Sequence, residues 1–367
     1  MSKRLSIAVN AALVGDGATG LAACTINIVQ ALDRLGERLI LFTSRPDVFP
    51  NVRAKVLSVP PALQLDRGAV GHVLRLAWTQ SVLRARLRGA GADVLLNPMP
   101  EGLLLASPVP QVTIVHDLIP LRYQREYPRQ QLYFRHYVPR VLRRSRAIVA
   151  VSESTSRDLG QFYGLAPAAI RIVPMGHDPQ RFSPGPPTTN SPYALYVGNV
   201  MPHKNLIRLV EAFADTKLGC RRLVICGSGR RPHVQALQER IVGLGLESRV
   251  DWRPYVSDTE LVGLYRGARM LMLPSLYEGF GLTALEAMAC GTPVIAANLS
   301  SLPELVDDAA LLVDPTDPGA IADAASRLFT DDRLVAELSA RGLARARLFS
   351  WERTAATLRA VLHEAAG

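Results

Sequence analysis

Short apolar runs alternate with longer amphipathic stretches along the whole sequence, and this alternation limits the folds that the chain can adopt. The pattern begins with an apolar run at Leu5–Val14, a glycine-containing turn, a helical pattern at Leu21–Leu35 and a second run at Leu39–Thr43. Similar runs recur at 93–96, 112–115, 147–151, 193–197, 222–226 and 270–273. Buried strands separated by helices are typical of parallel sheets covered on both faces. The sequence therefore predicts an α/β protein with doubly wound parallel sheets.

The length of the chain and one proline-rich segment indicate two domains. The 367 residues exceed the roughly 250–300 at which a single hydrophobic core stops growing. The segment from Phe182 to Pro192 offers no apolar face and contains four prolines, which break helices and strands alike. We predict a first domain at residues 1–182, a linker at 183–192 and a second domain at 193–350.

The net charge of +10 comes entirely from the first half of the chain. Residues 1–185 hold 23 basic and 12 acidic side chains, whereas residues 186–367 hold 19 and 20. A charge that served solubility alone would be spread evenly, so the excess predicts that the first domain faces a large anionic partner. The four cysteines show no C-x-x-C spacing, which argues against a disulfide framework or a zinc site and fits a reducing cytoplasm.

A glycine loop follows the first apolar run. Gly15-x-Gly17-x-x-Gly20 matches the dinucleotide-binding fingerprint, with a predicted strand before it and a helix after it. The fingerprint also expects an acidic residue at the end of the second strand, where this chain has Phe42-Thr43-Ser44-Arg45. Three interpretations stay open: a nicotinamide-cofactor site, a plain tight turn, and a loop whose amides approach a phosphate or sugar at a helix N-terminus.

Two carboxylates bracket a second glycine loop in the other half of the chain. Glu278 and Glu286 flank a segment of almost only apolar residues and glycine, in which Gly279 and Gly281 permit a tight bend before a helix at Thr283–Ala289. The spacing predicts that both carboxylates face the same side. Because a buried carboxylate needs a partner, we interpret the pair as functional rather than as a solvated helix face.

At these residues the chain resembles the retaining nucleotide-sugar glycosyltransferases of family four. The resemblance rests on Glu278-x7-Glu286 and its sequel at 287–296, and on motifs at 115–117, 149–154 and 196–205, in order along nearly the whole chain. It implies GT-B architecture, in which two Rossmann-like doubly wound parallel-sheet domains face each other across a cleft. It also implies that the last helix, at 351–367, crosses back onto the first domain.

The resemblance assigns Lys204 to the diphosphate of the donor, where a cation stabilises the charge that develops as the sugar departs. The family often has an arginine where this chain has Asn199, and some members have one where it has His203. Each departure leaves one fewer cation at the diphosphate. The first-turn amides of Leu282 and Thr283 are therefore expected to carry more of that role.

The resemblance also assigns the groups around the sugar and the nucleoside. Position alone would make His116 a buried structural histidine, but the family places it against the donor sugar, with Glu278 on the sugar hydroxyls and Glu286 on the ribose. No dedicated nucleophile and no D-x-D metal site are implied, so we expect no metal and no cofactor. The residues expected to bind the donor are Gly15, Gly17, Asn199, His203, Gly227, Gly281, Leu282, Thr283 and Glu286.

A basic stretch marks the first domain. Eight arginines lie between Arg122 and Arg146 against the single acid Glu126, interleaved with five aromatic residues. Such segments describe nucleic-acid surfaces, helices on anionic lipid or merely solvated faces. With the family resemblance, we expect this face to meet the acceptor or an anionic membrane, and not nucleic acid. The residues expected to do so are Arg140, Arg143 and Arg144.

These features together predict a glycosyltransferase at the cytoplasmic face of the cell membrane. It moves a hexose, mannose or glucose, from a GDP-sugar or UDP-sugar to a lipid-diphosphate-linked or other glycan acceptor in surface polysaccharide biosynthesis. An NAD-dependent oxidoreductase built on the Gly15 loop is the alternative. A noncatalytic basic protein that binds membranes or nucleic acid is the third possibility.

Overall fold

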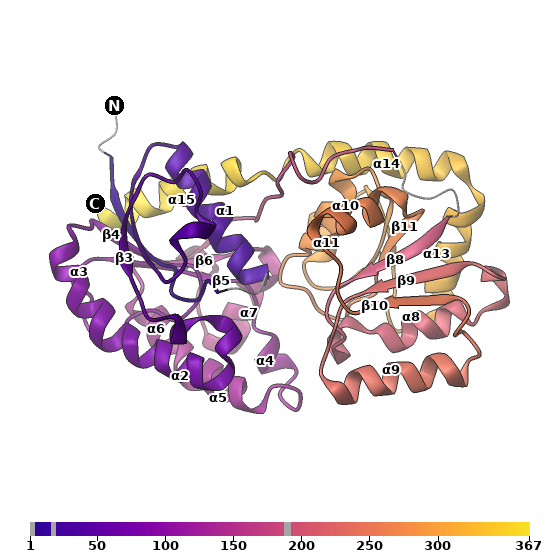
Figure 1. Ribbon diagram of the computed structural model, residues 1–367, viewed down its shortest axis with the longest axis horizontal. Helices are drawn as coiled ribbons and strands as arrows, with labels where there is room; N and C mark the ends of the chain where they lie inside the picture. The colour runs from indigo at the N-terminus through magenta and orange to yellow at the C-terminus, as the bar shows by residue number, and fades with distance from the viewer. Residues whose placement is uncertain (1–3, 16–19, 187–191) are drawn as a thin grey trace. The chain divides into compact units, whose positions relative to one another are not determined.

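The computed structural model describes residues 4–15, 20–186 and 192–367, and the chain divides into two compact units (Figure 1). Unit 1 runs to Met175 and resumes at Trp351, and unit 2 is Gly176–Ser350. Each unit is built on a parallel sheet covered by helices, which confirms the fold class that the alternating pattern predicted.

Seven strands form the sheet in the described part of unit 1, all parallel, in the order β3-β2-β1-β4-β5-β6-β7. The strand order reverses between β1 and β4, and sheets of this kind bind ligands beside that point, at the carboxyl ends of the strands. The strands are β1 (Ser6–Asn10), β2 (Arg38–Thr43), β3 (Ala54–Ser58), β4 (Val94–Asn97), β5 (Gln111–Val115), β6 (Ala147–Ala150) and β7 (Ile170–Ile172).

Helices cover this sheet, and their ends follow local sequence. For example, the Ser152 side chain caps α7 by accepting the amide of Thr155, and Gly164 ends the helix at a φ of +67°. The helices of unit 1 are α1 (Gly20–Arg34), α2 (Gly68–Trp78), α3 (Arg84–Ala90), α4 (Ile119–Arg122), α5 (Pro128–His136), α6 (Val138–Arg144), α7 (Glu153–Tyr163) and α15 (Trp351–Ala366). A π-helical turn, η4 (Thr79–Leu83), joins α2 to α3, and the 3-10 turns are η1 (Pro46–Val48), η2 (Pro61–Leu63), η3 (Leu65–Arg67) and η5 (Pro167–Ala169).

The C-terminal helix α15 packs against α1 of unit 1. A buried carboxylate, Glu37, fixes it there by accepting hydrogen bonds from Arg359 Nε at 2.6 Å, His363 Nε2 at 2.9 Å and the amide of Leu5 at 2.7 Å. Burial alone would raise the pKa of Glu37, but these three hydrogen bonds outweigh it and lower the pKa below its ordinary value. The last helix is therefore part of unit 1.

Six strands form the sheet in the described part of unit 2, again all parallel, in the order β10-β9-β8-β11-β12-β13. They are β8 (Tyr193–Val197), β9 (Arg222–Cys226), β10 (Val250–Arg253), β11 (Met270–Leu273), β12 (Val294–Ala297) and β13 (Ala310–Val313). The helices are α8 (Leu206–Phe213), α9 (Arg231–Gly243), α10 (Asp258–Gly267), α11 (Leu282–Ala289), α12 (Leu302–Val306), α13 (Pro318–Thr330) and α14 (Asp332–Ala346), with 3-10 turns η6 (Pro202–Lys204) and η7 (Thr216–Leu218).

The boundary between the units corrects the sequence prediction, which ended the first domain at residue 182 and began the second at 193. Residues 176–182 belong to unit 2. The ring of Phe182 packs edge-on against Tyr265 at 6.0 Å between centroids, and Arg266 Nε donates to the Ser183 carbonyl at 2.8 Å. Burial of the aromatic ring of Phe182 against Tyr265 stabilises this packing, so the chain becomes part of unit 2 before the proline-rich segment begins. Across the described residues, we find no helix with both the length and the apolar character that spanning a bilayer requires.

Candidate active site

The carboxyl ends of β8 and β9 approach so closely that only glycine fits between them. A Cβ on Gly227 would lie 1.9 Å from the carbonyl oxygen of Gly198, and Gly227 has a φ of +146°. The Gly198 amide donates to the Cys226 carbonyl, and the amide of Val200 donates to that of Ser228, both at 2.9 Å. Gly227 is therefore required for the close approach of these two segments at the carboxyl edge of the sheet, the edge at which sheets of this kind bind ligands.

The turn that carries Lys204 is fixed to the end of β11 by Asn205. Asn205 takes a φ of +63°, and its Nδ2 donates to the carbonyls of Pro274 at 2.9 Å and Pro315 at 2.7 Å. The amide of Leu276 donates to the His203 carbonyl at 2.7 Å. These hydrogen bonds hold η6 beside the segment that leads to Glu278.

Lys204 and Glu278 form an ion pair within unit 2. The Lys204 Nζ lies 2.7 Å from Oε1 and 2.8 Å from Oε2 of Glu278, and the two side chains are only 19% and 10% exposed. Two serines hold the backbone of Glu278: its amide donates to Ser300 Oγ at 2.9 Å, and Ser301 Oγ donates to its carbonyl at 3.0 Å. The structure thus brings together two of the three residues predicted to act in catalysis.

The two positions where the family has arginine contribute no positive charge here. Burial and, to a smaller extent, the nearby Lys204 ammonium lower the pKa of His203 to about 4 against the opposing charge of Glu278, so this imidazole is neutral at pH 7. The side chain of Asn199 is exposed, and its carbonyl accepts the hydroxyl of Tyr196 at 3.1 Å. Lys204 is therefore the cation that this turn offers.

Helix α11 begins at a glycine that no other residue could replace. Gly281 has a φ of +104°, and a Cβ there would lie 2.9 Å from Leu302 Cδ2 and 3.0 Å from Leu305 Cδ2. Leu282 and Thr283 follow as the first two helical residues, whose amides have no acceptor within a helix. These amides are suited to an anion, as the sequence predicted.

Glu286 has a different partner from Glu278. Its Oε2 accepts the hydroxyl of the buried Tyr265 at 2.8 Å. Burial raises the pKa of Glu286 to about 7, although the Tyr265 hydroxyl and the charge of Arg181 act in the opposite direction. This carboxyl therefore changes its charge near neutral pH.

The third predicted catalytic residue, His116, lies in unit 1 directly after β5. Its Nε2 donates to the carbonyl of Pro98 at 2.8 Å, and burial lowers its pKa. The neutral ring therefore carries its proton on Nε2, which leaves Nδ1 as a hydrogen-bond acceptor. Asp117 Oδ1 accepts the amide of Ile119 at 3.0 Å, an Asx turn that orders the loop.

The glycine loop after β1 is described only in part. A Cβ on Gly15 would lie about as close to Gln64 Cβ, at 3.0 Å, as to the carboxylate of Asp66, at 3.1 Å. Gly20 is exposed at the start of α1. Gly17 lies outside the described residues, so the predicted role of this loop stays a prediction.

The basic segment of unit 1 presents its arginines outward and turns its aromatic rings inward. Arg140, Arg143 and Arg144 on α6 are exposed. The Tyr133 hydroxyl donates to the Pro100 carbonyl at 2.7 Å, and the Tyr137 hydroxyl donates to the Gly102 carbonyl at 3.0 Å. The aromatic residues that the sequence interleaves with arginines are thus occupied in packing, and these two are not available to stack on bases.

Sequence reasoning missed the residues that position the site, namely Tyr265, Asn205, Ser300 and Ser301. Asn205 stands inside the motif at 196–205, so its place beside Lys204 was a usable signal. Tyr265 and the two serines carry no local signal, because their roles depend on contacts with residues that are distant in sequence. Among the described residues, no group of three or more His, Cys, Asp or Glu side chains is arranged to hold a metal ion.

Comparison with known proteins decides the family. Residues 18–181 match the model of Glycosyltransferase Family 4, and residues 178–345 match that of Glycosyl transferases group 1. A D-inositol 3-phosphate glycosyltransferase of Xylanimonas cellulosilytica is 31% identical over an alignment of 378 positions, which covers 93% of this chain and 90% of that protein. The chain belongs to glycosyltransferase family 4. Membership favours glycosyl transfer over the oxidoreductase and the noncatalytic alternatives.

One further sequence relative and one solved structure are also similar to this chain. The O-antigen chain mannosyltransferase B of Escherichia coli is 42% identical over 162 residues, a match that spans 44% of this chain and 42% of that protein. The structure of HepE from Anabaena in complex with UDP-glucose has a TM-score of 0.77 over 98% of this chain and all of the other, at 17% identity. This likeness, together with the two parallel-sheet units, confirms GT-B architecture.

Proposed function

We propose that the chain is a retaining, metal-independent glycosyltransferase that moves a hexose, mannose or glucose, from a GDP-sugar or UDP-sugar to a lipid-linked or other glycan acceptor. The observation that carries the proposal is the mostly buried ion pair of Lys204 and Glu278. The O-antigen mannosyltransferase and the UDP-glucose complex among its relatives support the choice of sugar and nucleotide. A role in surface polysaccharide biosynthesis rests on the same comparison.

Each side chain takes a distinct role in this proposal. Lys204 and the amides at the start of α11 stabilise the diphosphate as it leaves with its electron pair. Glu278 accepts hydrogen bonds from the sugar hydroxyls, and Glu286 accepts them from the ribose. His116 accepts a hydroxyl of the sugar through Nδ1. The acceptor hydroxyl attacks from the face that the diphosphate leaves, and the diphosphate takes up its proton, so the anomeric configuration is retained without a protein nucleophile.

Ligand binding and product analysis test this function. GDP or UDP is expected to raise the thermal midpoint, whereas NAD leaves it unchanged, because a ligand that binds only the folded state stabilises it by mass action. The GDP and UDP forms of mannose and glucose are then compared by nucleotide release, with and without a chelator, and the product linkage is assigned by NMR. Stabilisation by NAD alone would contradict glycosyl transfer, an inverted product would contradict retention, and loss of activity with the chelator would contradict metal independence.

The pKa of Glu286 predicts a pH dependence of donor binding. The ionised carboxylate accepts hydrogen bonds from the ribose hydroxyls more strongly than the protonated acid does, and the ionised form prevails above pH 7 because the folded pKa is about 7. The affinity for an intact nucleotide sugar is expected to rise between pH 6 and pH 8. The ligand itself does not change its protonation in this range. Calorimetry measures it.

A matched variant separates this carboxyl from other titrating groups. Glu286→Gln is expected to bind the donor more weakly and with no pH dependence in this range. Tyr265→Phe removes the hydroxyl that lowers the pKa of Glu286, so the midpoint of the rise is expected to move to higher pH. The same pH dependence in Glu286→Gln as in the wild type would assign the titration to another group.

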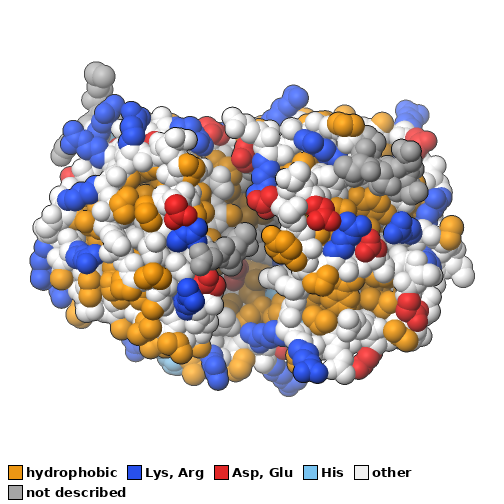
Figure 2. All heavy atoms as spheres, in the orientation of Figure 1, with side chains coloured by type: hydrophobic (Ala, Val, Ile, Leu, Met, Phe, Trp, Pro, Cys, Tyr) orange, Lys and Arg blue, Asp and Glu red, His pale blue; other side chains and the backbone are white. Residues whose placement is uncertain are grey.

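The membrane partner of the proposal rests on unit 1. Helix α2 exposes Val70, Val73 and Leu74 by 70%, 63% and 43%. Figure 2 shows hydrophobic side chains gathered over the part of unit 1 where Figure 1 places α2, with Lys and Arg side chains around them. Apolar residues beside exposed arginines suit an anionic bilayer surface better than water. We propose that this face holds the enzyme at the inner surface of the cell membrane, close to a lipid-linked acceptor.

Substitution of three arginines tests the membrane face. Changing Arg140, Arg143 and Arg144 together to Gln is expected to weaken binding to anionic vesicles by about 10²-fold, since each basic side chain near such a surface contributes about 1 kcal/mol. Raising the salt concentration should weaken wild-type binding in the same direction. Cosedimentation with the vesicles measures both effects.

The control removes the same charge from unit 2. Arg231, Arg333 and Arg347 are also exposed, and their joint change to Gln should leave vesicle binding nearly unchanged. Transfer to a short water-soluble acceptor should survive the unit 1 change. Vesicle binding that changes neither with salt nor with the substitution of the three unit 1 arginines would refute the membrane face. A preference for nucleic acid over vesicles at equal ionic strength would also refute it.

A further inference from the structure

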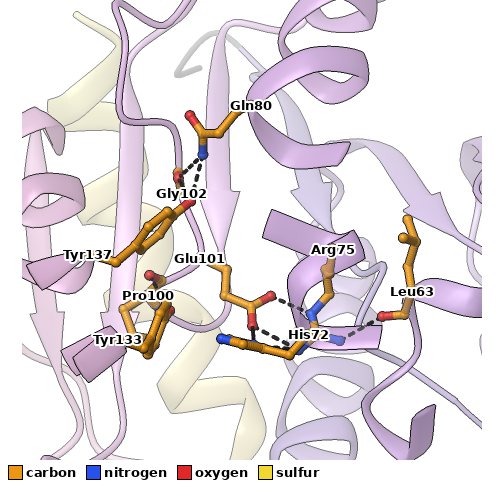
Figure 3. A network of polar contacts seen from close by, with 9 residues as sticks. All are labelled: Leu63, His72, Arg75, Gln80, Pro100, Glu101, Gly102, Tyr133 and Tyr137. Carbon is orange, nitrogen blue, oxygen red and sulfur yellow. Dashed lines mark hydrogen bonds and ion pairs between the residues drawn. The ribbon is translucent and has the colours of Figure 1, made fainter. Parts of the chain in front are cut away.

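A buried ion pair joins helix α2 to the loop that follows β4 (Figure 3). Arg75 is 2% exposed and Glu101 is 1% exposed. Arg75 binds the carboxylate through two nitrogens: Nε donates to Oε2, and Nη2 donates to Oε1 at 2.8 Å. Its remaining nitrogen, Nη1, donates to the carbonyl of Leu63 at 2.7 Å. His72, also on α2, contacts Glu101 Oε1 through Nδ1 at 3.0 Å.

The protonation of this group follows from its geometry. Burial would raise the pKa of Glu101, but the contacts with His72 and Arg75 outweigh it and lower the pKa. An ionised carboxylate only accepts hydrogen bonds, so His72 carries a proton on Nδ1. The His72 ring stands edge-on to Tyr133 at 4.7 Å between centroids. Glu101 is thus held from several sides by groups that fix its position.

Glu101 belongs to a loop, residues 98–104, that follows β4 and is held along its whole length. The contacts come from side chains of α2, η4, α5, β5 and the residue between α5 and α6. The Tyr133 hydroxyl donates to the Pro100 carbonyl at 2.7 Å, and the Tyr137 hydroxyl and Gln80 Nε2 each donate to the Gly102 carbonyl at 3.0 Å. The Leu103 amide donates to Gln111 Oε1, and the Leu104 amide donates to Gln80 Oε1, both at 2.9 Å.

The first residue of this loop touches the predicted catalytic histidine. The carbonyl of Pro98 accepts the proton of His116 Nε2 at 2.8 Å. This hydrogen bond decides which nitrogen of the neutral ring carries the proton and in which direction Nδ1 points. The position of the loop backbone therefore sets the orientation of His116.

Stability alone does not account for the ion pair. Replacing a buried ion pair by apolar residues of similar volume is often neutral or stabilising, because the charges lose their hydration on burial. Helix α2 does not follow the usual distribution of side chains, because it exposes the apolar Val70, Val73 and Leu74 and buries the charged Arg75. What a bidentate pair supplies better than an apolar contact is a fixed geometry.

We propose that Arg75 and Glu101 are positioning residues for glycosyl transfer: they fix loop 98–104 so that the Pro98 carbonyl holds His116 Nε2 and leaves Nδ1 aimed at the donor sugar. The inference rests on the proposed function, in which His116 contacts that sugar. It assigns the pair a larger role in turnover than in donor binding, because the other proposed donor contacts, Lys204, Glu278 and Glu286, belong to unit 2.

A double variant tests the proposal. Arg75→Met combined with Glu101→Leu removes both charges and keeps an apolar filling, so the protein is expected to fold with a thermal midpoint close to that of the wild type. We expect kcat to fall about tenfold or more, since a small displacement of a contact group impairs the reactive geometry, while KM for the donor changes less than twofold. Arg75→Lys, which keeps one charged donor, should recover part of kcat.

A control replaces another ion pair of the same unit, in which Glu37 is buried and the Arg359 side chain is 33% exposed. Glu37→Leu with Arg359→Met removes the contact that fixes α15, and kcat should stay near the wild-type value. A readout besides activity is the imidazole ¹⁵N spectrum of His116, which is expected to report the Nε2–H tautomer in the wild type and a mixture of tautomers in the Arg75/Glu101 variant.

The outcomes separate this inference from the proposed function. A folded Arg75/Glu101 variant with wild-type kcat, or with reduced kcat and an unchanged His116 tautomer, overturns the positioning role. A changed tautomer in a protein that transfers no sugar from any donor supports the geometry and overturns the proposed function instead. If the double variant does not fold, Glu101→Gln, which keeps the size of the side chain, decides by the same two measurements.

Discussion

Lys204→Ala is expected to lower kcat by about 10²-fold or more, because in the proposed function it removes the cation that stabilises the departing diphosphate. In this chain neither neighbouring position replaces it: Asn199 is uncharged, and the pKa of His203 near 4 keeps that ring neutral at pH 7. The variant should also bind a nucleoside diphosphate much more weakly, while the corresponding nucleoside loses little affinity. Steady-state kinetics and calorimetry measure the two effects. Equal losses for both ligands would make Lys204 structural.

Controls for this prediction use the same unit. Lys217→Ala removes an exposed lysine that pairs with Asp323, and it should leave kcat unchanged. Lys204→Ala also leaves Glu278 without its ion-pair partner, which is expected to cost on the order of 1–3 kcal/mol of stability, since the pair is mostly buried. Adding Glu278→Gln to Lys204→Ala should recover part of that stability but none of the turnover, which separates folding from catalysis.

The strands that sequence patterns predicted are those buried on both faces. Tyr193–Val197 and Arg222–Cys226 coincide with β8 and β9, because a strand in the middle of a parallel sheet has apolar residues on both sides. β10, β12 and β13 were not predicted, although β12 lies inside its sheet and is fully buried. β3 and β7 were not predicted either. They are the edge strands of their sheet and are partly exposed, and β7 has only three residues, so neither produces an apolar run.

The contacts of the predicted site residues could not be read from the sequence. The motif around Glu278 and the turn at Lys204 both point to the donor site from sequence. Their ion pair joins residues 74 positions apart and depends on Asn205, which fixes the turn to the ends of two distant loops. The expectation that the two glutamates face one side stays a prediction, and their partners differ: Glu278 binds Lys204, and Glu286 binds Tyr265. Tertiary contacts of this kind leave no periodicity in the sequence.

For the aromatic residues of the basic segment, the sequence did not distinguish between two roles. Their spacing among arginines is equally consistent with a stacking surface and with packed helices, because α5 and α6 are too short to show a clear apolar face. For Tyr133 and Tyr137 the structure shows packing, because their hydroxyl groups donate hydrogen bonds to carbonyls of the loop after β4. These rings are therefore part of the support for that loop, whereas the arginines remain on the surface.

Glu278→Gln is expected to lower turnover by about 10²-fold or more and to leave the fold intact. The amide keeps the size of the carboxylate, so the contacts of its backbone with Ser300 and Ser301 are retained. One acceptor oxygen becomes a donor, however, and the hydrogen bonds that strengthen as positive charge develops on the sugar are lost in the transition state. The negative charge that holds the Lys204 ammonium is lost as well, which frees that cation to follow the diphosphate.

These two losses predict an asymmetry that a merely structural glutamate would not show. Nucleoside diphosphate affinity should be retained or raised in Glu278→Gln, because Lys204 no longer shares its charge with a carboxylate, while kcat falls. Glu239→Gln changes an exposed glutamate on α9 and should alter neither quantity. Near-normal turnover in Glu278→Gln at an unchanged thermal midpoint would remove Glu278 from the reaction. A parallel loss of kcat and nucleotide affinity would instead show that Glu278 acts by orienting Lys204 and does not contact the sugar.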